Sequence, residues 1–327
     1  MISIKKYTEK LNNIWDDFIF NSNNGTIFHT QQFLSYHQNK KFTNHSLLFF
    51  DKDILLAVLP ASIIKNNNQN ILCSHPGASF GGIVYSQNLN FITYNNIISC
   101  LEQYCIKKKF DIIRLINTPN IYHKIKDDSF NYLLQWREFI QKETYISHYL
   151  ENNFEIKTLD LLHKRKQRYI KNIIQNNKFS YRADQSFNLF YPILLQSKKL
   201  FKTFPTHSLK ELFLLKKEFP EKIHLLLFYD YQTVVGGSVL FFTTNDTVLI
   251  FYNAINPKYK QSHLSTYQLY ECMRFAKKNN KKIIDFGVSH TPETKNPLDP
   301  KFSLIQFKEH FSAKGVLRIV YEKALNE

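Results

Sequence analysis

The sequence predicts an α/β protein of the α+β type with two domains in tandem. Its 327 residues exceed one domain of ordinary size and suit two, each with its own core. Three strand-like runs, a helical segment and a further strand follow one another in the first half of the chain, and the same order returns in the second half. We therefore predict domains over 1–145 and 146–327.

The first domain begins with a predicted helix over 5–22, where apolar side chains recur at helical spacing, and Thr30 is a candidate N-cap for a second helix. Turn residues then separate three predicted strands, which are 45–50, 54–64 and 70–75. A glycine-bearing loop over 75–85 leads to an amphipathic helix over 90–109 and to a strand over 110–116.

The second domain opens with a predicted basic helix over 160–177, followed by two helices over 190–220 with Ser208 as a candidate N-cap. Three strands, a helix and a last strand complete the expected order, at 222–230, 233–243, 246–255, 265–280 and 281–287.

An internal duplication explains this repeated order. Aligning LLFFDKDILLAVLP with LLFYDYQTVVGGSV pairs Asp51 with Asp230. The strands that follow the two helices pair Arg114 with Asp285. We interpret the chain as two copies of a strand-strand-strand-helix-strand unit, in which a carboxylate of the second copy replaces an arginine of the first.

The composition indicates a folded protein with an excess of positive charge. A net charge of +16 is typical of proteins that meet nucleic acid, an anionic cofactor, a nucleotide-sugar or a membrane surface, although an AT-rich genome also favours lysine. Four cysteines without CxxC spacing, no apolar run of membrane-spanning length and no signal-peptide core predict a soluble cytoplasmic protein. The histidines form no HExxH motif and no His/Cys cluster, so we expect no metal.

The basic helix and the C-terminal stretch are the two segments that the sequence singles out for binding. The helix carries five cations, Lys164, Arg165, Lys166, Arg168 and Lys171. Such a face either contacts phosphates or is simply solvated. From Lys281 to Gly315, a strand ends in Asp285, a proline-rich loop follows, and a helical segment carries Lys308. This layout is typical of a ligand site, and equally of a solvated loop.

Six motifs in this order resemble the GNAT acyltransferase fold, and their tandem arrangement resembles its FemAB-like branch. They are HPGASFGG (75–82), HKRKQRYIK (163–171), PTHSL (205–209), VVGGSVLF (234–241), DFG (285–287) and QFKEHF (306–311). The resemblance covers most of the chain. It implies two GNAT-like domains, each a mixed, mostly antiparallel sheet flanked by helices, with the first degenerate and on the acceptor side.

The function that this resemblance implies is N-acyl transfer, with an acetyl group from acetyl-CoA as the favoured acyl-CoA donor. The acceptor would be a small amine such as an amino sugar, nucleotide-sugar or amino acid. In the cell-wall members of the family the donor is aminoacyl-tRNA, which keeps a FemX-like peptidyltransferase of cell-envelope biosynthesis, with tRNA as a partner, as the alternative. A third hypothesis is a non-catalytic basic protein that binds nucleic acid through the helix at 160–177.

Three residues are candidates for the chemistry. Asp285 would orient or deprotonate the acceptor amine, or else cap its own loop. Lys308, which matches a lysine near the reaction centre of the cell-wall members, would stabilise the oxyanion or a donor phosphate, or else lie on the surface. Tyr252 would donate a proton to the leaving group, or else belong to the core.

Two further groups of residues are candidates for binding. The turn that holds the cofactor pyrophosphate in GNAT enzymes corresponds to 257–271, which here lacks glycine, so charge, hydroxyls and helix-end amides would have to replace it. Its candidate donor-binding residues are Lys260, Ser262, His263, Ser265 and Thr266. The candidate acceptor-binding residues are His75, Ser79, Gly81, Gly82, His207 and Phe307. His75 alternatively caps the turn at Pro76.

Overall fold

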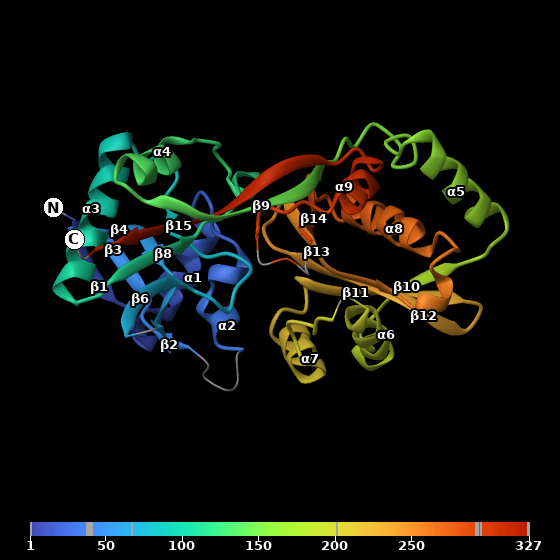
Figure 1. The fold of residues 1–327 in the computed structure, drawn as a ribbon, viewed down its shortest axis with the longest axis horizontal. Coiled ribbons are helices and arrows are strands. Elements are labelled where there is room, and N and C mark those ends of the chain that lie inside the picture. Colours follow the sequence, from blue (N-terminus) through green and yellow to red (C-terminus); the bar gives the residue numbers. More distant parts are fainter. Residues whose placement is uncertain are drawn as a thin grey trace. The chain divides into compact units, whose positions relative to one another are not determined.

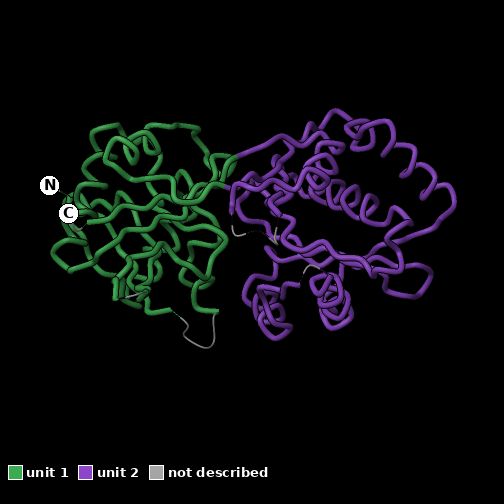
Figure 2. The backbone as a smooth tube through the Cα atoms, in the orientation of Figure 1, with its two compact units in different colours: residues 1–144, 317–327 green, residues 145–316 purple. Residues whose placement is uncertain are grey.

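The computed structural model describes residues 2–36, 42–66, 68–200, 202–291, 294 and 296–325, and it divides into two compact units. Unit 1 comprises Met1–Thr144 and Leu317–Glu327, and unit 2 comprises Tyr145–Val316 (Figure 2). The sequence predicts that the C-terminal segment belongs to the second domain, and the structure corrects this prediction. Leu317–Glu327 belongs to unit 1 because strand β15 (Lys314–Ala324) pairs there with β8 (Ile112–Ile116), a long-range pairing that no local pattern announces.

Unit 1 contains a four-stranded sheet and five strands of an eleven-stranded sheet. The first has the order β1-β3-β4-β7, with bounds Ile2–Lys6, Leu47–Asp51, Ile54–Leu59 and Val84–Tyr85. The second contains β15, β8, β6, β5 and β2, where β6 is Gln69–Ser74, β5 is Ala61–Asn66 and β2 is Thr43–Asn44. The predicted strand over 54–64 is therefore two strands, β4 and β5, since Pro60 interrupts the backbone hydrogen-bond ladder between them.

The helices of unit 1 are α1 (Asn12–Asn21), α2 (Gln31–Leu34), α3 (Phe91–Lys107) and α4 (Ser129–Trp136). Trp15 of α1 packs with Leu48, whereas α3 packs with Leu47 and Phe49, so successive residues of β3 face two different cores. The predicted helix over 5–22 is wrong at its beginning, because residues 2–6 pair with β3 as strand β1. Tertiary pairing overrides the helical pattern there.

One twisted sheet organises unit 2 (Figure 1). Its order is β10-β11-β12-β13-β14-β9, with bounds Ser180–Asp184, Ile223–Asp230, Thr233–Phe242, Thr247–Ile255, Ile283–Val288 and Ile140–Glu151. All of these neighbours are antiparallel except β13 and β14, which are parallel. The sheet is thus mixed and mostly antiparallel, as predicted.

Helices cover both faces of this sheet: α5 (Lys164–Gln175), α6 (Phe187–Lys199), α7 (Leu209–Glu218), α8 (Leu264–Lys278) and α9 (Phe302–Glu309). The paired glycines of β12 allow this close packing. A Cβ on Gly236 would lie 2.3 Å from Gln268 Nε2 of α8, and one on Gly237 would lie 2.4 Å from the ring of Phe190 of α6. Any side chain at either position would push a helix away from the sheet.

The pairing registers confirm the duplication. In unit 1 the parallel pairing of β6 with β8 ends at Cys73 opposite Arg114. In unit 2 the parallel pairing of β13 with β14 ends at Leu249 opposite Asp285. The alignment of Arg114 with Asp285 is therefore correct, and both residues stand at the last paired position of equivalent strands.

Within the described ranges, no helix has both the length and the apolar character that a membrane crossing requires. The same residues contain no group of three or more His, Cys, Asp or Glu side chains placed to hold a metal ion.

Candidate functional site

The candidate site of unit 2 begins where β13 and β14 part. Only Thr247–Leu249 of β13 pair with Ile283–Asp285 of β14, although β13 continues to Ile255 and β14 to Val288. A register shift leaves Phe251 of β13 without a partner on β12, between the paired residues Ile250 and Tyr252. Beyond Asp285, no strand pairing among the described residues joins the two strands, so the edge of β13 from Ile250 to Ile255 has no β14 partner there.

Asp285 lies at this parting point with 0 % of its surface exposed. Its carboxylate accepts hydrogen bonds from Ser147 Oγ of β9 at 3.1 Å and from the backbone N–H of Gly287 at 2.7 Å. Gly287 has a φ of 76°, a left-handed conformation that the carboxylate stabilises. Asp285 therefore shapes the end of β14, in agreement with the loop-capping alternative.

Lys308 of α9 contacts the same end of β14 and is 5 % exposed. Its Nζ donates to the carbonyl oxygens of Gly287 and Val288 at 2.7 and 2.9 Å, and to Ser289 Oγ at 2.9 Å. The lysine is thus buried and bonded, which rules out the surface alternative. The sequence did not predict that its charge also anchors the backbone.

Ser289 connects Lys308 to a histidine that sequence reasoning missed. His148 Nδ1 of β9 lies 2.9 Å from Ser289 Oγ. Because a serine hydroxyl both donates and accepts, Ser289 Oγ can accept from Lys308 and donate to a neutral His148 at Nδ1. Burial and then the Lys308 ammonium hold the pKa of His148 below its ordinary value, which keeps the ring neutral and able to accept that proton.

Tyr252 and His207, one predicted for chemistry and the other for binding, are in contact. The backbone N–H of His207 donates to Tyr252 Oη at 3.1 Å, and His207 Nδ1 lies 3.0 Å from the same oxygen. Burial raises the pKa of Tyr252 to about 12, so the phenol keeps its proton near neutral pH. The ammonium of Lys198 lies 6.0 Å from the centre of its ring.

The predicted donor-binding residues surround the N-terminus of α8. His263 precedes the helix in a left-handed conformation with a φ of 61°, and its side chain does not cap the helix. Ser265 and Thr266 lie in the first turn, whereas Ser262 Oγ donates to the carbonyl oxygen of Tyr259 at 2.6 Å. Lys260 is exposed in the preceding turn. The N–H groups of Thr266 and Tyr267 donate to the carbonyl oxygen of His263, so the first amides of the helix, those of Leu264 and Ser265, are the ones left to attract an anion.

Lys166 of α5, one of the five cations that the sequence singled out on the basic helix, is buried beside this helix end, which the sequence did not predict. It is 9 % exposed, and its Nζ donates to Thr266 Oγ1 at 3.2 Å. The same Nζ lies 4.2 Å from the ring centre of Phe307 and 5.7 Å from that of Phe311. Burial, followed by Arg165, lowers the pKa of Lys166 to about 8. No carboxylate among the described residues forms an ion pair with it.

Other cations reinforce this charge. Tyr169 of α5 stacks on His263 with ring centres 3.6 Å apart, and Arg165 Nε donates to Tyr169 Oη at 2.6 Å. After burial, the cations Lys166, Lys178 and Arg165 hold the pKa of His263 below its ordinary value. The described part of this region is thus a cluster of positive charge at the positive end of a helix dipole.

Phe307, predicted to bind the acceptor, instead contacts Lys166 and lies 5.4 Å from Phe311 between ring centres. Its position remains compatible with a ligand held by Lys166. The spacing of Lys166 with the buried residues Ile170 and Ile173, four and seven positions on, was the signal that could have identified a buried lysine.

In unit 1, the loop over 75–82 is held by a hydrogen bond within it and by a contact with His29. His75 Nδ1 accepts from the backbone N–H of Gly77 at 3.3 Å, so His75 caps the turn at Pro76 as the alternative predicted. His29 Nε2 lies 2.9 Å from the carbonyl oxygen of Gly81. Gly82 has a φ of 75°, and Ser79 is half-buried. A role of this loop in acceptor binding stays a prediction.

Comparison with known proteins finds similarity of fold alone. No family model matches the chain, and no curated protein sequence matches it. The structure of FemX has a TM-score of 0.72 at 11% identity, covering 99% of this chain and 98% of that one. A tandem GNAT protein from the clavulanic acid biosynthesis pathway has a TM-score of 0.58 at 6% identity, covering 100% and 99%. The C-terminal domain of a putative lysylphosphatidylglycerol synthetase from Agrobacterium fabrum has 0.58 at 7%, covering 97% and 92%.

Proposed function

From the tandem GNAT fold that this chain shares with FemX, we propose an acyltransferase that moves an acyl group from a phosphate-bearing donor, acyl-CoA, to the amine of a small acceptor. The observation that carries the proposal is Lys166, a buried cation with no carboxylate partner among the described residues, at the N-terminus of α8. The acceptor class follows from the resemblance and includes amino sugars, nucleotide-sugars and amino acids.

A bound phosphate would relieve the electrostatic conflict at this helix end. Lys166 and the uncapped N–H groups of α8 are both positive, so each opposes the other in the donor-free protein. A phosphate placed between them would accept hydrogen bonds from the ammonium, from Thr266 Oγ1 and from the first-turn amides. The arrangement replaces by charge the glycine-rich turn that this chain lacks.

The extended part of the donor would lie along β13 beyond Leu249, where the strand no longer pairs with β14. Backbone groups of an unpaired strand edge bind extended amide chains through hydrogen bonds, as in strand addition. This placement would bring the donor past Tyr252 of β13 and its acyl carbonyl toward the end of β14, which Asp285 and Lys308 hold.

The transfer forms a bond between the acceptor nitrogen and the acyl carbon and breaks the bond from that carbon to the donor sulfur. Positive charge from Lys308 would stabilise the oxyanion, and Tyr252, which keeps its proton because its pKa is about 12, would protonate the leaving thiolate. His207 would return a proton to Tyr252. The proton lost by the amine would pass to solvent or to a neutral histidine.

A change of Asp285 to Asn separates its charge from its structural role. The amide oxygen still accepts from Ser147 and Gly287, so we expect the free energy of unfolding to change by no more than about 1 kcal/mol. If the carboxylate orients the amine, kcat/KM for the acceptor falls by about 10²-fold. Steady-state kinetics at fixed donor measures this, with Asp246→Asn as the exposed control, and unchanged kcat/KM would assign Asp285 a structural role only.

Aminoacyl-tRNA is the second candidate donor, and a specific observation favours it. Lys164, Arg165, Arg168 and Lys171 of α5 are exposed beside the same helix end, more positive charge than one pyrophosphate needs. Removing them would then weaken tRNA binding with a reduced salt dependence, while leaving CoA binding nearly unchanged.

The deciding experiment measures binding of acetyl-CoA and of an aminoacyl-tRNA to the full chain across a range of salt concentrations. We expect acetyl-CoA to bind and to be displaced by CoA. Binding of aminoacyl-tRNA alone selects the second candidate. RNA binding without any acyl transfer, unaffected by changes of Lys308 and Asp285, would return the chain to the class of non-catalytic nucleic-acid-binding proteins.

A further inference from the structure

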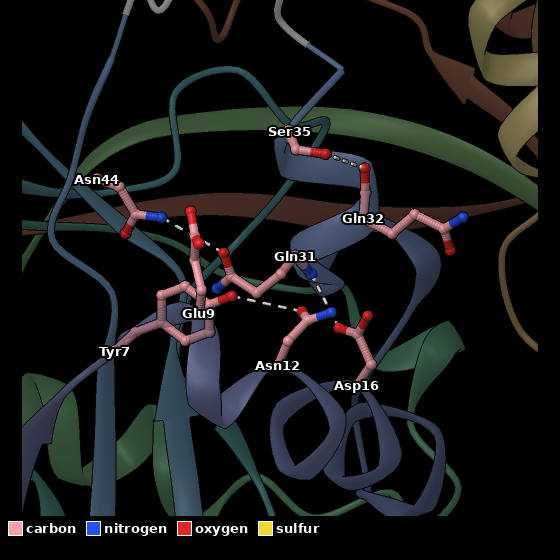
Figure 3. Close-up of a pocket in the computed structure, with 8 residues that line it drawn as sticks. All are labelled: Tyr7, Glu9, Asn12, Asp16, Gln31, Gln32, Ser35 and Asn44. Atoms are coloured by element: carbon pink, nitrogen blue, oxygen red, sulfur yellow. Dashed lines mark hydrogen bonds between the residues drawn. The ribbon is translucent and has the colours of Figure 1, made fainter.

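A polar pocket in unit 1 stands apart from every residue considered above. Its volume is about 610 Å³, and its walls come from the start of the chain, α1, α2 and β2. This size is ordinary for a small-molecule site. Figure 3 shows the side chains of Tyr7, Glu9, Asn12, Asp16 and Gln31 close to one another, while that of Gln32 points away from them.

The charge of this pocket is opposite to that of the chain. Lysine and arginine contribute 43 of the 327 residues, yet the described residues that line the pocket include neither. They do include two acidic residues, Glu9 and Asp16. Burial, the largest cause, raises the pKa of the Asp16 carboxyl, and Asp17 raises it further. Burial and then the Asp16 and Glu9 carboxylates raise the pKa of the Tyr7 phenol. Both carboxylates thus act on Tyr7, and the described residues that line the pocket include no cation to balance them.

An unsatisfied donor accompanies these carboxylates. Gln31 is 7 % exposed and lines the pocket, and its buried Nε2 has no hydrogen-bond partner among the residues that the structure describes. Its Oε1 accepts from Asn44 Nδ2 at 3.3 Å, which fixes the orientation of the amide. A buried amide donor is ordinarily satisfied, and one left open in a pocket indicates a ligand oxygen.

We propose that this pocket binds a small primary amine that carries a hydroxyl or carbonyl oxygen close to its nitrogen. The ammonium contacts the carboxylates of Asp16 and Glu9, and the oxygen accepts from Gln31 Nε2. Carboxylate and phosphate ligands are repelled by the same wall. The inference concerns binding only, and it holds whether or not the chain transfers acyl groups.

The first test is binding of glucosamine and of L-serinamide to the full chain by isothermal titration calorimetry, at about pH 6, where such amines are protonated. N-acetylglucosamine and glucose are the uncharged controls for glucosamine. We expect at least one of the two amines to bind, and neither control to bind with comparable affinity. Failure of both amines, or equal binding of the uncharged sugars, overturns the proposal.

Matched variants locate the bound amine. Asp16→Asn keeps an oxygen for the backbone N–H of Gln31, which Asp16 Oδ1 accepts at 2.9 Å, and removes only the charge. We expect about tenfold weaker binding from this change, and several-fold weaker binding from Gln31→Leu. Asp53→Asn, in the turn between β3 and β4, is exposed, does not line the pocket and should leave affinity unchanged. Equal affinity of the Asp16→Asn variant and the unmodified chain overturns the proposal, provided that their melting temperatures agree.

Discussion

Changing Lys166 to Met is expected to make the donor-free protein more stable and its donor affinity much lower. The methionine removes a buried cation that has no carboxylate partner among the described residues and that opposes the dipole of α8. We expect the free energy of unfolding to rise by about 1–2 kcal/mol. Loss of a charge-assisted bond to the donor phosphate should weaken donor binding by about 10- to 100-fold.

The gain in stability should depend on pH in a defined direction. Burial lowers the pKa of Lys166 to about 8 in the folded protein, from an ordinary value of 10.5. Between these values the unfolded chain binds more protons, so the stability of the unmodified protein rises with pH. The advantage of the methionine variant is therefore complete below about pH 8 and decreases as the pH approaches 10.5.

Urea unfolding at several pH values and donor titration measure the two effects separately. Lys210→Met, an exposed lysine of α7, is the control and should change neither quantity. A variant that loses stability at neutral pH, or that binds donor as tightly as the unmodified chain, contradicts the assignment of Lys166 to an anion site.

Changing Lys308 to Ala is expected to abolish transfer and to weaken the fold at once. The change leaves the carbonyl oxygens of Gly287 and Val288 and the hydroxyl of Ser289 without the buried donor that they share. We expect a loss of about 3 kcal/mol in the free energy of unfolding, and a fall of about 10²- to 10³-fold in kcat when the folded form is assayed.

The two losses are distinguishable by temperature. If transfer fails only because the variant unfolds, cooling it well below its melting point restores kcat. If the charge acts on the reaction, kcat stays low in fully folded protein. Ser289→Ala keeps the Lys308 charge and removes a single acceptor, so it should retain more activity than Lys308→Ala. Near-normal kcat in folded Lys308→Ala protein would remove Lys308 from the chemistry.

The repeated strand order was predictable because each strand and helix has its own local pattern. Runs such as those of β11, β12 and β13 are apolar, β-branched and bounded by turn residues, and the structure places them within a residue of their predicted ends. Strands β1, β2, β7, β9, β10 and β15 were missed. Residues 2–6 carry charges between apolar residues, and only their partner β3 makes them a strand.

The candidate site was predictable in part. The sequence pointed to the segments around Asp285 and Lys308, and the structure brings both to the end of β14 through Gly287. It did not indicate Ser289 with His148, because these residues lie on β14's continuation and on β9, far apart in the chain. Contacts of that kind arise from strand pairing, which leaves no trace in either local sequence.

By itself, the sequence determined the α+β class, the duplication, the equivalence of Arg114 and Asp285 in the two copies, and the location of positive charge on α5. Those features depend on residue type and spacing, which are local properties. Only the tertiary structure decided that Lys166 is buried at the N-terminus of α8, that the last segment returns to unit 1, and that an acidic pocket exists in a basic chain. Each of these depends on which distant segment covers a residue, because burial and charge balance are set by packing.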